Sequence, residues 1–230
     1  MCGIAGNVSA SENRPLVERM LQEVAHRGPD GSGISVHAIS DSRSLVLGHR
    51  RLSILDLSDA GAQPMADATG RFVLTYNGEI YNYVEIRAEL AALGAVFHSH
   101  SDTEVILEAY KQWGTACLDR FNGMFAFALY DSVRHVLFCA RDRYGEKPFL
   151  FSFGTDFFAF ASEYKALLQH PGISLDVDEW RLLRAAHNAS TAPTDRSMPP
   201  IKMTSVMPMA MIPFSDAKRT ILSRLFGSRK

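Results

Sequence analysis

Apolar side chains recur at two different spacings over roughly the first 170 residues, and these spacings predict strands interleaved with helices. After Pro15, a residue type common in the first helical turn, Leu16, Met20, Leu21 and Val24 repeat at helical spacing. The same two spacings predict further helices at residues 84–93 and 103–113, and strands at residues 3–8, 34–39, 44–48, 71–76, 136–140, 149–153 and 157–160.

Residues 124–130, Met-Phe-Ala-Phe-Ala-Leu-Tyr, are apolar at odd and even positions alike. A strand with one face in water would alternate apolar with polar residues, so this strand must be covered on both faces. Several buried antiparallel strands and a few amphipathic helices predict two sheets stacked on each other with helices outside. A four-layer αββα sandwich, of the α+β class, meets this requirement.

The chain changes character after about residue 171. Residues 178–187 fit one more helix, whereas residues 188–214 hold five of the ten prolines and five of the nine methionines without a clear period. Residues 215–230 place apolar side chains on one helical face among basic ones. That pattern is typical either of a helix that contacts a partner or a membrane surface, or of a frayed terminal helix without a role.

Composition and charge exclude several classes of protein. A formal net charge of -1 gives no field that would attract nucleic acid or an anionic membrane, so neither is expected as a partner. Three cysteines without paired spacing favour a reducing, cytoplasmic setting over a disulfide framework or a metal site. The sequence also contains no signal-peptide core and no run of about 18 apolar residues, so no membrane span is expected.

Cys2 is the strongest candidate for chemistry because it follows the start methionine. Removal of Met1 would leave one residue with both a thiol and a free α-amine. The thiol can act as a nucleophile, and the amine, with an ordinary pKa of about 7.7–8.0, can act as its base. The alternative is a small, buried and inert cysteine beside the first strand. For Cys117 and Cys139, which lie in apolar surroundings, that packing role is the prediction.

Two segments that follow predicted strands carry groups suited to an amide substrate. Arg50 and Arg51 end one strand, and a guanidinium offers a planar fork to a carboxylate. For Arg50 a solvated strand-end charge is the preferred interpretation. Asn77-Gly78 follows another strand and could form a tight turn, yet it also supplies a side-chain amide and an unobstructed backbone N–H. Those two donors suit a developing oxyanion.

Asp102 lies at the start of a predicted helix, where its carboxylate could hold a substrate ammonium. Ser101 and Glu104 have the spacing of a capping box, which by itself would explain the segment. Arg141-Asp142-Arg143 follows a strand end, where a structural ion pair is expected.

Seven ordered motifs carry a resemblance to a known family: MCGIAG, HRGPDG, GHRRLSILDL, YNGEIYNY, SDTEVI, RFNGMFAFALYD and RDRYGEKPF. Together they resemble the glutaminase domain of glutamine-dependent asparagine synthetases, which are class II glutamine amidotransferases. The resemblance covers roughly residues 2–172. It implies the N-terminal nucleophile hydrolase fold, which is an αββα sandwich, and L-glutamine as the substrate.

The resemblance also implies roles for particular residues. Cys2 would be the nucleophile and its own α-amine the base. Arg51 would bind the α-carboxylate of glutamine, while Asn77 and Gly78 would form the oxyanion hole. Two acids, Glu79 and Asp102, would face the α-ammonium group, and the pocket would be lined by Leu52, Ser53, Ile54 and Leu55. No metal or organic cofactor is implied for this half of the reaction.

The sequence departs from the family in its last part. Full-length members continue into an ATP pyrophosphatase domain with a Ser-Gly-Gly phosphate loop, and this chain has no adjacent glycine pair. We therefore predict a glutamine amidotransferase domain at residues 2–172 and a divergent, poorly ordered extension at residues 173–230, with the synthetase domain absent. ATP and Mg²⁺ would be needed only by that absent domain.

Three hypotheses about function remain open at this stage. The first is an active glutaminase domain that feeds ammonia to a separate synthetase domain or subunit, with a homodimer as a further option. The second is a non-catalytic module that binds glutamine. The third is a truncated or frame-shifted remnant.

Overall fold

The computed structural model describes residues 1–10, 12–40, 42–173 and 208–213. Its helices are α1 (Arg14–Glu23), α2 (Tyr83–Ala92), α3 (Asp102–Trp113) and α4 (Tyr164–Leu167). Its strands are β1 (Gly3–Ser9), β2 (Gly31–Ser40), β3 (Arg43–Arg51), β4 (Met65–Ala66), β5 (Phe72–Ile80), β6 (Gly123–Asp131), β7 (Val136–Arg141), β8 (Leu150–Phe153), β9 (Phe158–Ala161) and β10 (Pro208–Pro213).

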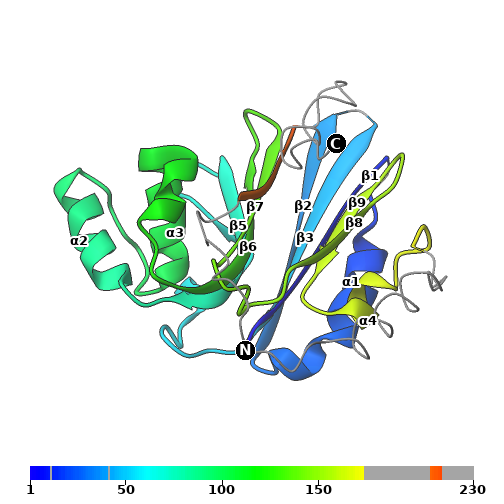
Figure 1. Cartoon of the computed structure of the whole chain (residues 1–230), viewed down its shortest axis with the longest axis horizontal. Helices are drawn as coiled ribbons and strands as arrows, with labels where there is room; N and C mark the ends of the chain where they lie inside the picture. The colour runs from blue at the N-terminus through cyan, green and yellow to red at the C-terminus, as the bar shows by residue number, and fades with distance from the viewer. Residues whose placement is uncertain (11, 41, 174–207, 214–230) are drawn as a thin grey trace, which may run out of the picture.

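Two five-stranded antiparallel sheets form the centre of the fold. One has the strand order β2-β3-β1-β9-β8 and is called sheet A here; the other, sheet B, has the order β10-β7-β6-β5-β4. Figure 1 shows the two sheets facing each other, with α2 and α3 outside sheet B and α1 and α4 outside sheet A. The predicted four-layer αββα sandwich of the α+β class is therefore confirmed.

Strand β6 explains why the sequence is apolar on both faces there. Phe125, Phe127 and Leu129 pack into the core between sheet B and the helices α2 and α3. Ala126 and Tyr130 point the other way, together with Ala128, into the core between the two sheets. The small alanines let the sheets approach closely, while the phenylalanines fill the wider space beneath the helices. A third apolar core lies between sheet A and the helices α1 and α4.

Most predicted elements are present within one to three residues of the expected bounds, but several features differ. Strand β5 runs on through Asn77 and Gly78, so this pair forms no turn. Asp142 forms no ion pair with any residue that the structure describes; it accepts hydrogen bonds from backbone N–H groups instead. Residues 208–213, for which no element is predicted, form β10 on the edge of β7.

Other predictions fall on parts of the chain that the structure does not describe. The helix expected at residues 178–187 and the basic amphipathic segment at residues 215–230 lie outside the described residues. Among the helices that are described, none is both long and apolar enough to cross a bilayer.

Candidate active site

Cys2 lies just before β1 and is held against the end of β3. Its neighbour Gly3 pairs with Arg50 in the sheet A ladder, which brings the chain after Arg51 over the thiol. The backbone N–H of Leu52 donates to the Cys2 Sγ atom at 3.4 Å, and Sγ lies 3.6 Å from the Leu52 carbonyl oxygen. The sulfur is thus partly exposed and fixed by main-chain groups, unlike a cysteine sealed in a core.

The surroundings of Cys2 favour the neutral thiol over the thiolate. Burial raises its pKa above the ordinary value, and the nearby Asp102 carboxylate acts in the same direction. The Leu52 N–H, the charge of the chain's N-terminus and Arg51 oppose this rise without cancelling it. At neutral pH the sulfur therefore carries its proton, and a base must remove that proton before the sulfur can attack a carbonyl carbon.

Arg51 ends β3 and reaches into the loop that follows it. Its Nη1 atom donates to the Ser58 carbonyl oxygen at 2.9 Å, and its Nη2 atom donates to the Asp56 carbonyl oxygen. Gly61 makes room for the guanidinium, since a Cβ atom there would lie 2.5 Å from Nη2. These contacts fix the plane of the guanidinium, which a site for a bidentate carboxylate requires. The adjacent Arg50 does not line the cavity described below.

Asn77 and Gly78 reach the site from the other sheet, near the end of β5. Asn77 is 1% exposed, and its Nδ2 atom has no hydrogen-bond partner among the described residues. Gly78 lies so close to β6 that a Cβ atom would be 2.3 Å from the Met124 carbonyl oxygen. A buried amide donor without a partner is costly, so its presence points to an acceptor supplied by a ligand.

Asp102, the first residue of α3, is anchored from the same strand. Its Oδ2 atom accepts hydrogen bonds from the Tyr76 hydroxyl at 2.7 Å and from the Ile80 N–H at 3.0 Å. Burial raises the pKa of Asp102, against the opposing effect of these two hydrogen bonds. Only half of the expected capping box forms at this helix start: the Ser101 Oγ accepts from Thr103 N–H, while Glu104 bonds the chain at Ser99 instead.

A cavity of about 110 Å³ brings these groups together. Every sequence-predicted site residue lines it: Cys2, Arg51, Leu52, Ser53, Ile54, Leu55, Asn77, Gly78, Glu79 and Asp102. Among these predicted residues are a thiol, a guanidinium, two carboxylates and an amide donor that has no partner in the described part of the chain. The individual roles predicted for these residues in binding and catalysis stay predictions.

Sequence reasoning assigned no role to several other residues that build this site. Gln63 accepts from the Tyr76 N–H through Oε1 and donates through Nε2 to the Thr103 hydroxyl, so it ties β5 to α3 beside the cavity. Lys147 also lines the cavity. Nothing in the local sequence around Gln63 signals these two contacts, which span 13 and 40 residues.

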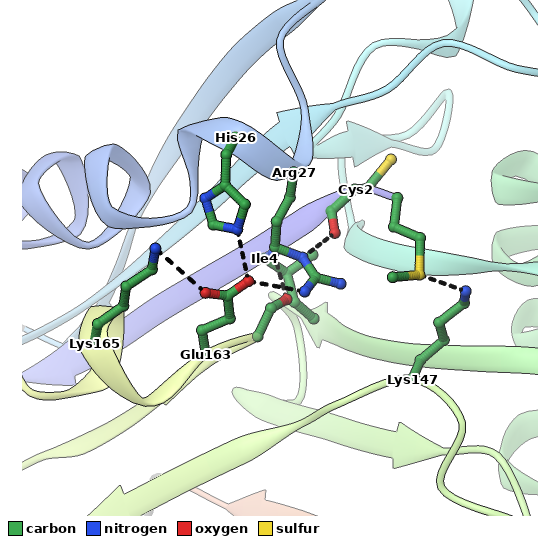
Figure 2. A network of polar contacts seen from close by, with 9 residues as sticks. Cys2, Ile4, His26, Arg27, Lys147, Glu163 and Lys165 are labelled. Atoms are coloured by element: carbon green, nitrogen blue, oxygen red, sulfur yellow. Dashed lines mark hydrogen bonds and ion pairs between the residues drawn. The ribbon is translucent and has the colours of Figure 1, made fainter.

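Arg27 forms a second network, behind the thiol (Figure 2). Its Nε atom donates to the Cys2 carbonyl oxygen at 2.9 Å, and its Nη1 atom donates to Glu163 at 2.9 Å. His26 also contacts Glu163, at 3.0 Å. Burial acts to raise the pKa of Glu163, but its hydrogen bond to Arg27 and the charge of His26 hold that pKa below its ordinary value.

The remaining cysteines and the acidic and histidine residues offer no further centre of this kind. Cys117 and Cys139 are buried, and burial raises the pKa of the Cys117 thiol to about 12 and that of Cys139 further. Within the described ranges, no three His, Cys, Asp or Glu side chains cluster closely enough to hold a metal ion.

Residues 1–224 match the family described as the glutamine amidotransferase domain, and the chain belongs to that family. Among its curated relatives is asparagine synthetase (glutamine-hydrolyzing) 3 of Bacillus subtilis, 41% identical over 184 residues, which covers 77% of this chain and 29% of the relative. A putative asparagine synthetase (glutamine-hydrolyzing) of Mycobacterium bovis is 44% identical over 183 residues, or 73% of this chain and 28% of the relative. The chain thus spans less than a third of the length of these relatives.

Solved structures agree with this assignment at the level of the fold. Glutamine phosphoribosylpyrophosphate amidotransferase from B. subtilis aligns with a TM-score of 0.61 and 22% identity, over 72% of this chain and 43% of that one. A second structure, described as the allosteric regulatory enzyme of purine biosynthesis, gives a TM-score of 0.62 at 22% identity, over 73% of this chain and 43% of that one. At this identity the likeness concerns the sandwich of two sheets.

Proposed function

We propose that this domain hydrolyses L-glutamine to glutamate and ammonia, with Cys2 as nucleophile. One observation carries the proposal: a single cavity holds the Cys2 thiol, the Asn77 amide, which has no partner among the described residues, and groups of opposite charge in Arg51 and Asp102. A free amino acid with a side-chain amide presents a carboxylate, an ammonium group and a carbonyl oxygen. The cavity offers a complementary group for each of them.

The proposed chemistry begins after removal of Met1. The α-amine of Cys2 takes the proton from the thiol, and the sulfur attacks the side-chain amide carbon of glutamine. The oxyanion that forms accepts hydrogen bonds from Asn77 Nδ2 and the Gly78 N–H. The protonated α-amine then donates its proton to the leaving nitrogen, which departs as ammonia and leaves a glutamyl thioester. Water adds to the thioester with the amine again as base, and glutamate and the thiol are released.

The substrate's charged end is assigned to two groups that the fold holds rigidly. Arg51, fixed by the Asp56 and Ser58 carbonyls, binds the α-carboxylate. Asp102, fixed by Tyr76 and Ile80, binds the α-ammonium with Glu79 beside it. The main chain of the segment from Leu52 to Leu55 forms the wall between this end and the sulfur. No cofactor is proposed for this half-reaction.

The proposed destination of the ammonia is supported by the relatives rather than by this cavity. Because these relatives are glutamine-hydrolyzing asparagine synthetases, we propose that the ammonia serves asparagine formation from aspartate. That step would need a synthetase domain or subunit with its own ATP and Mg²⁺. A homodimer and a cytoplasmic location are part of the same proposal, the latter because the three cysteines are all free.

The test is ammonia release from glutamine by the purified chain, with the mass of the mature N-terminus measured on the same sample. The proposal expects Met1 to be absent and ammonia to form in step with glutamate. Replacement Cys2→Ala should abolish turnover, a loss of at least about 1,000-fold, and leave the unfolding transition in place. The matched control Cys139→Ala should keep turnover. Glutamine binding without turnover in the wild-type protein would instead favour the non-catalytic module.

A further inference from the structure

Lys147 is a buried lysine at the wall of the cavity, and the proposed reaction gives it no role. The residue is 5% exposed and follows β7 in the loop that leads to β8. Its Nζ atom lies 3.0 Å from the Met1 Sδ atom, as Figure 2 shows. Met1 is 57% exposed and is the residue whose removal the proposed reaction requires.

The backbone of Lys147 is fixed from both sides. Its N–H donates to Asp142 Oδ2 at 3.0 Å, and its carbonyl oxygen accepts from Arg141 Nε at 2.6 Å. Asp142 also accepts from the N–H groups of Phe125 and Glu146, so it organises the whole loop around one carboxylate. The lysine therefore points into the cavity because of a built loop rather than by chance.

The ammonium of Lys147 lacks an acidic partner in the described part of the chain, where no ion pair includes it. A thioether sulfur is a weak acceptor, so the contact with Met1 compensates little of the cost of burying a charge. The other charged side chains that line the cavity are Arg51, Asp56, Glu79 and Asp102. Asp56 and Asp102 already accept hydrogen bonds from the chain.

Removal of Met1 changes the surroundings of Lys147 in a defined way. The Met1 sulfur that contacts Nζ leaves, and a new amine appears on Cys2, the residue to which Met1 was bonded. Resting on the proposed function, we propose that Lys147 is a positioning residue whose ammonium faces the liberated Cys2 amine and keeps it neutral. Like charges at close range disfavour protonation of the amine, and only a neutral amine can take the proton from the thiol.

Substitution of Lys147 tests this role through the titration of the amine itself. The measurement follows the ¹⁵N NMR signal of the Cys2 amine against pH, in protein whose N-terminus is verified as Cys2 by mass spectrometry. In Lys147→Met the amine should titrate about 1 pH unit higher than in the wild type. Lys147→Arg, which keeps the charge, should titrate as the wild type does. The matched control Lys111→Met removes a lysine that pairs with Glu108 elsewhere and should have no effect.

Turnover provides the second readout. In Lys147→Met the acidic limb of the plot of kcat/KM against pH should move to higher pH by the same amount, while kcat/KM at high pH stays as in the wild type. An unchanged amine titration in both Lys147→Met and Lys147→Gln would overturn the inference, as would failure of both variants to fold, since Lys147 would then be a structural residue. The two proposals can fail separately. If the wild-type protein does not turn over glutamine but the Cys2 amine still titrates higher in Lys147→Met, the proposed function is refuted and the role of Lys147 stands.

Discussion

Arg27 donates a hydrogen bond from Nε to the carbonyl oxygen of Cys2 over 2.9 Å, although 25 residues separate them. The same guanidinium bonds Glu163, which comes 136 residues later at the start of α4. Cys2, the proposed nucleophile, is therefore held through its main chain, and its side chain is left lining the cavity. This arrangement fixes Cys2 without using any group that the proposed chemistry needs.

Replacement Glu163→Gln should destabilise the protein in a pH-dependent way. Because Arg27 and His26 hold the pKa of Glu163 below its ordinary value of 4.5, the ionised form stabilises the fold. That contribution is complete above pH 4.5 and disappears as the pH falls through the lower, folded-state pKa. The variant should lose about 1 kcal/mol of unfolding free energy at pH 7, and urea unfolding should show the difference shrinking as the pH falls below 4.5.

The control for this prediction is Glu18→Gln, which removes an exposed pair with Arg14 on α1. It should change the unfolding free energy by no more than about 0.5 kcal/mol at any pH. A Glu163→Gln protein with wild-type stability at pH 7 would contradict the prediction.

His49 should make stability fall steeply below neutral pH. It is fully buried and donates from Nε2 to the Tyr76 carbonyl oxygen at 3.1 Å, which links β3 of sheet A to β5 of sheet B. Burial lowers the pKa of His49 to about 3, so the unfolded chain takes up a proton near pH 6.5 that the folded protein excludes. Its contribution is present above pH 6.5 and is lost as the pH falls toward 3.

The expected cost at pH 5 relative to pH 7 is about 2 kcal/mol from this one group. Replacement His49→Gln should remove that part of the pH dependence in urea unfolding experiments, whatever it does to stability at pH 7. The exposed His98, replaced in the same way, should leave the slope as it is in the wild type. Equal slopes for the wild type and His49→Gln would show that the buried ring does not titrate as argued.

Replacement Asn77→Ala should lower the rate of the chemical step and leave glutamine affinity nearly unchanged. Its Nδ2 atom has no partner within the described structure and is assigned to the oxyanion, which exists only after attack. A fall in kcat of about 100- to 1,000-fold is expected, measured as ammonia release at saturating glutamine. The control Asn13→Ala removes an amide that caps no helix N–H and should have no effect on kcat. A raised KM with normal kcat would reassign Asn77 to ground-state binding.

Replacement Arg51→Lys should act on glutamine binding. A lysine ammonium cannot keep the contacts to the Asp56 and Ser58 carbonyls and also offer two parallel donors to a carboxylate. KM for glutamine should rise about 10-fold, the value of one charge-assisted hydrogen bond. Arg50→Lys provides the matched control because Arg50 does not line the cavity. Equal KM values for the two variants would remove Arg51 from carboxylate binding.

The sandwich could be predicted from the sequence because its central strands are apolar on both faces. Residues 124–130 demand cover on both sides, and β6 receives it from the helices and from the opposite sheet. The end of strand β5 was harder to predict, since Asn77-Gly78 has the composition of a turn. Its path is set instead by pairing with β6, where Gly78 lies opposite Phe125 and only a glycine fits.

The charged and amide groups of the site could be located because each lies in a short motif. The residues that hold these groups in place could not be predicted, because their contacts depend on packing between distant segments of the chain. Gln63 contacts Tyr76 and Thr103, and Arg27 contacts Glu163, through bonds that no local pattern encodes. The ion pair expected at Asp142 was wrong for the same reason: its oxygens are occupied by the backbone of a loop that the sequence alone does not shape.

The proposed nucleophile and the proposed oxyanion donor come from opposite sheets of the sandwich: Cys2 precedes β1 of sheet A, and Asn77 lies on β5 of sheet B. The position of Cys2 relative to Asn77 therefore depends on how sheet A packs against sheet B. Replacement of Ala126 or Ala128, which lie between the sheets, by a larger residue would leave the strand pairing of each sheet intact and move the Cys2 sulfur away from the Asn77 amide. In such variants the turnover rate would fall before the unfolding free energy did. Turnover would therefore be a more sensitive measure of the distance between the sheets than an unfolding curve.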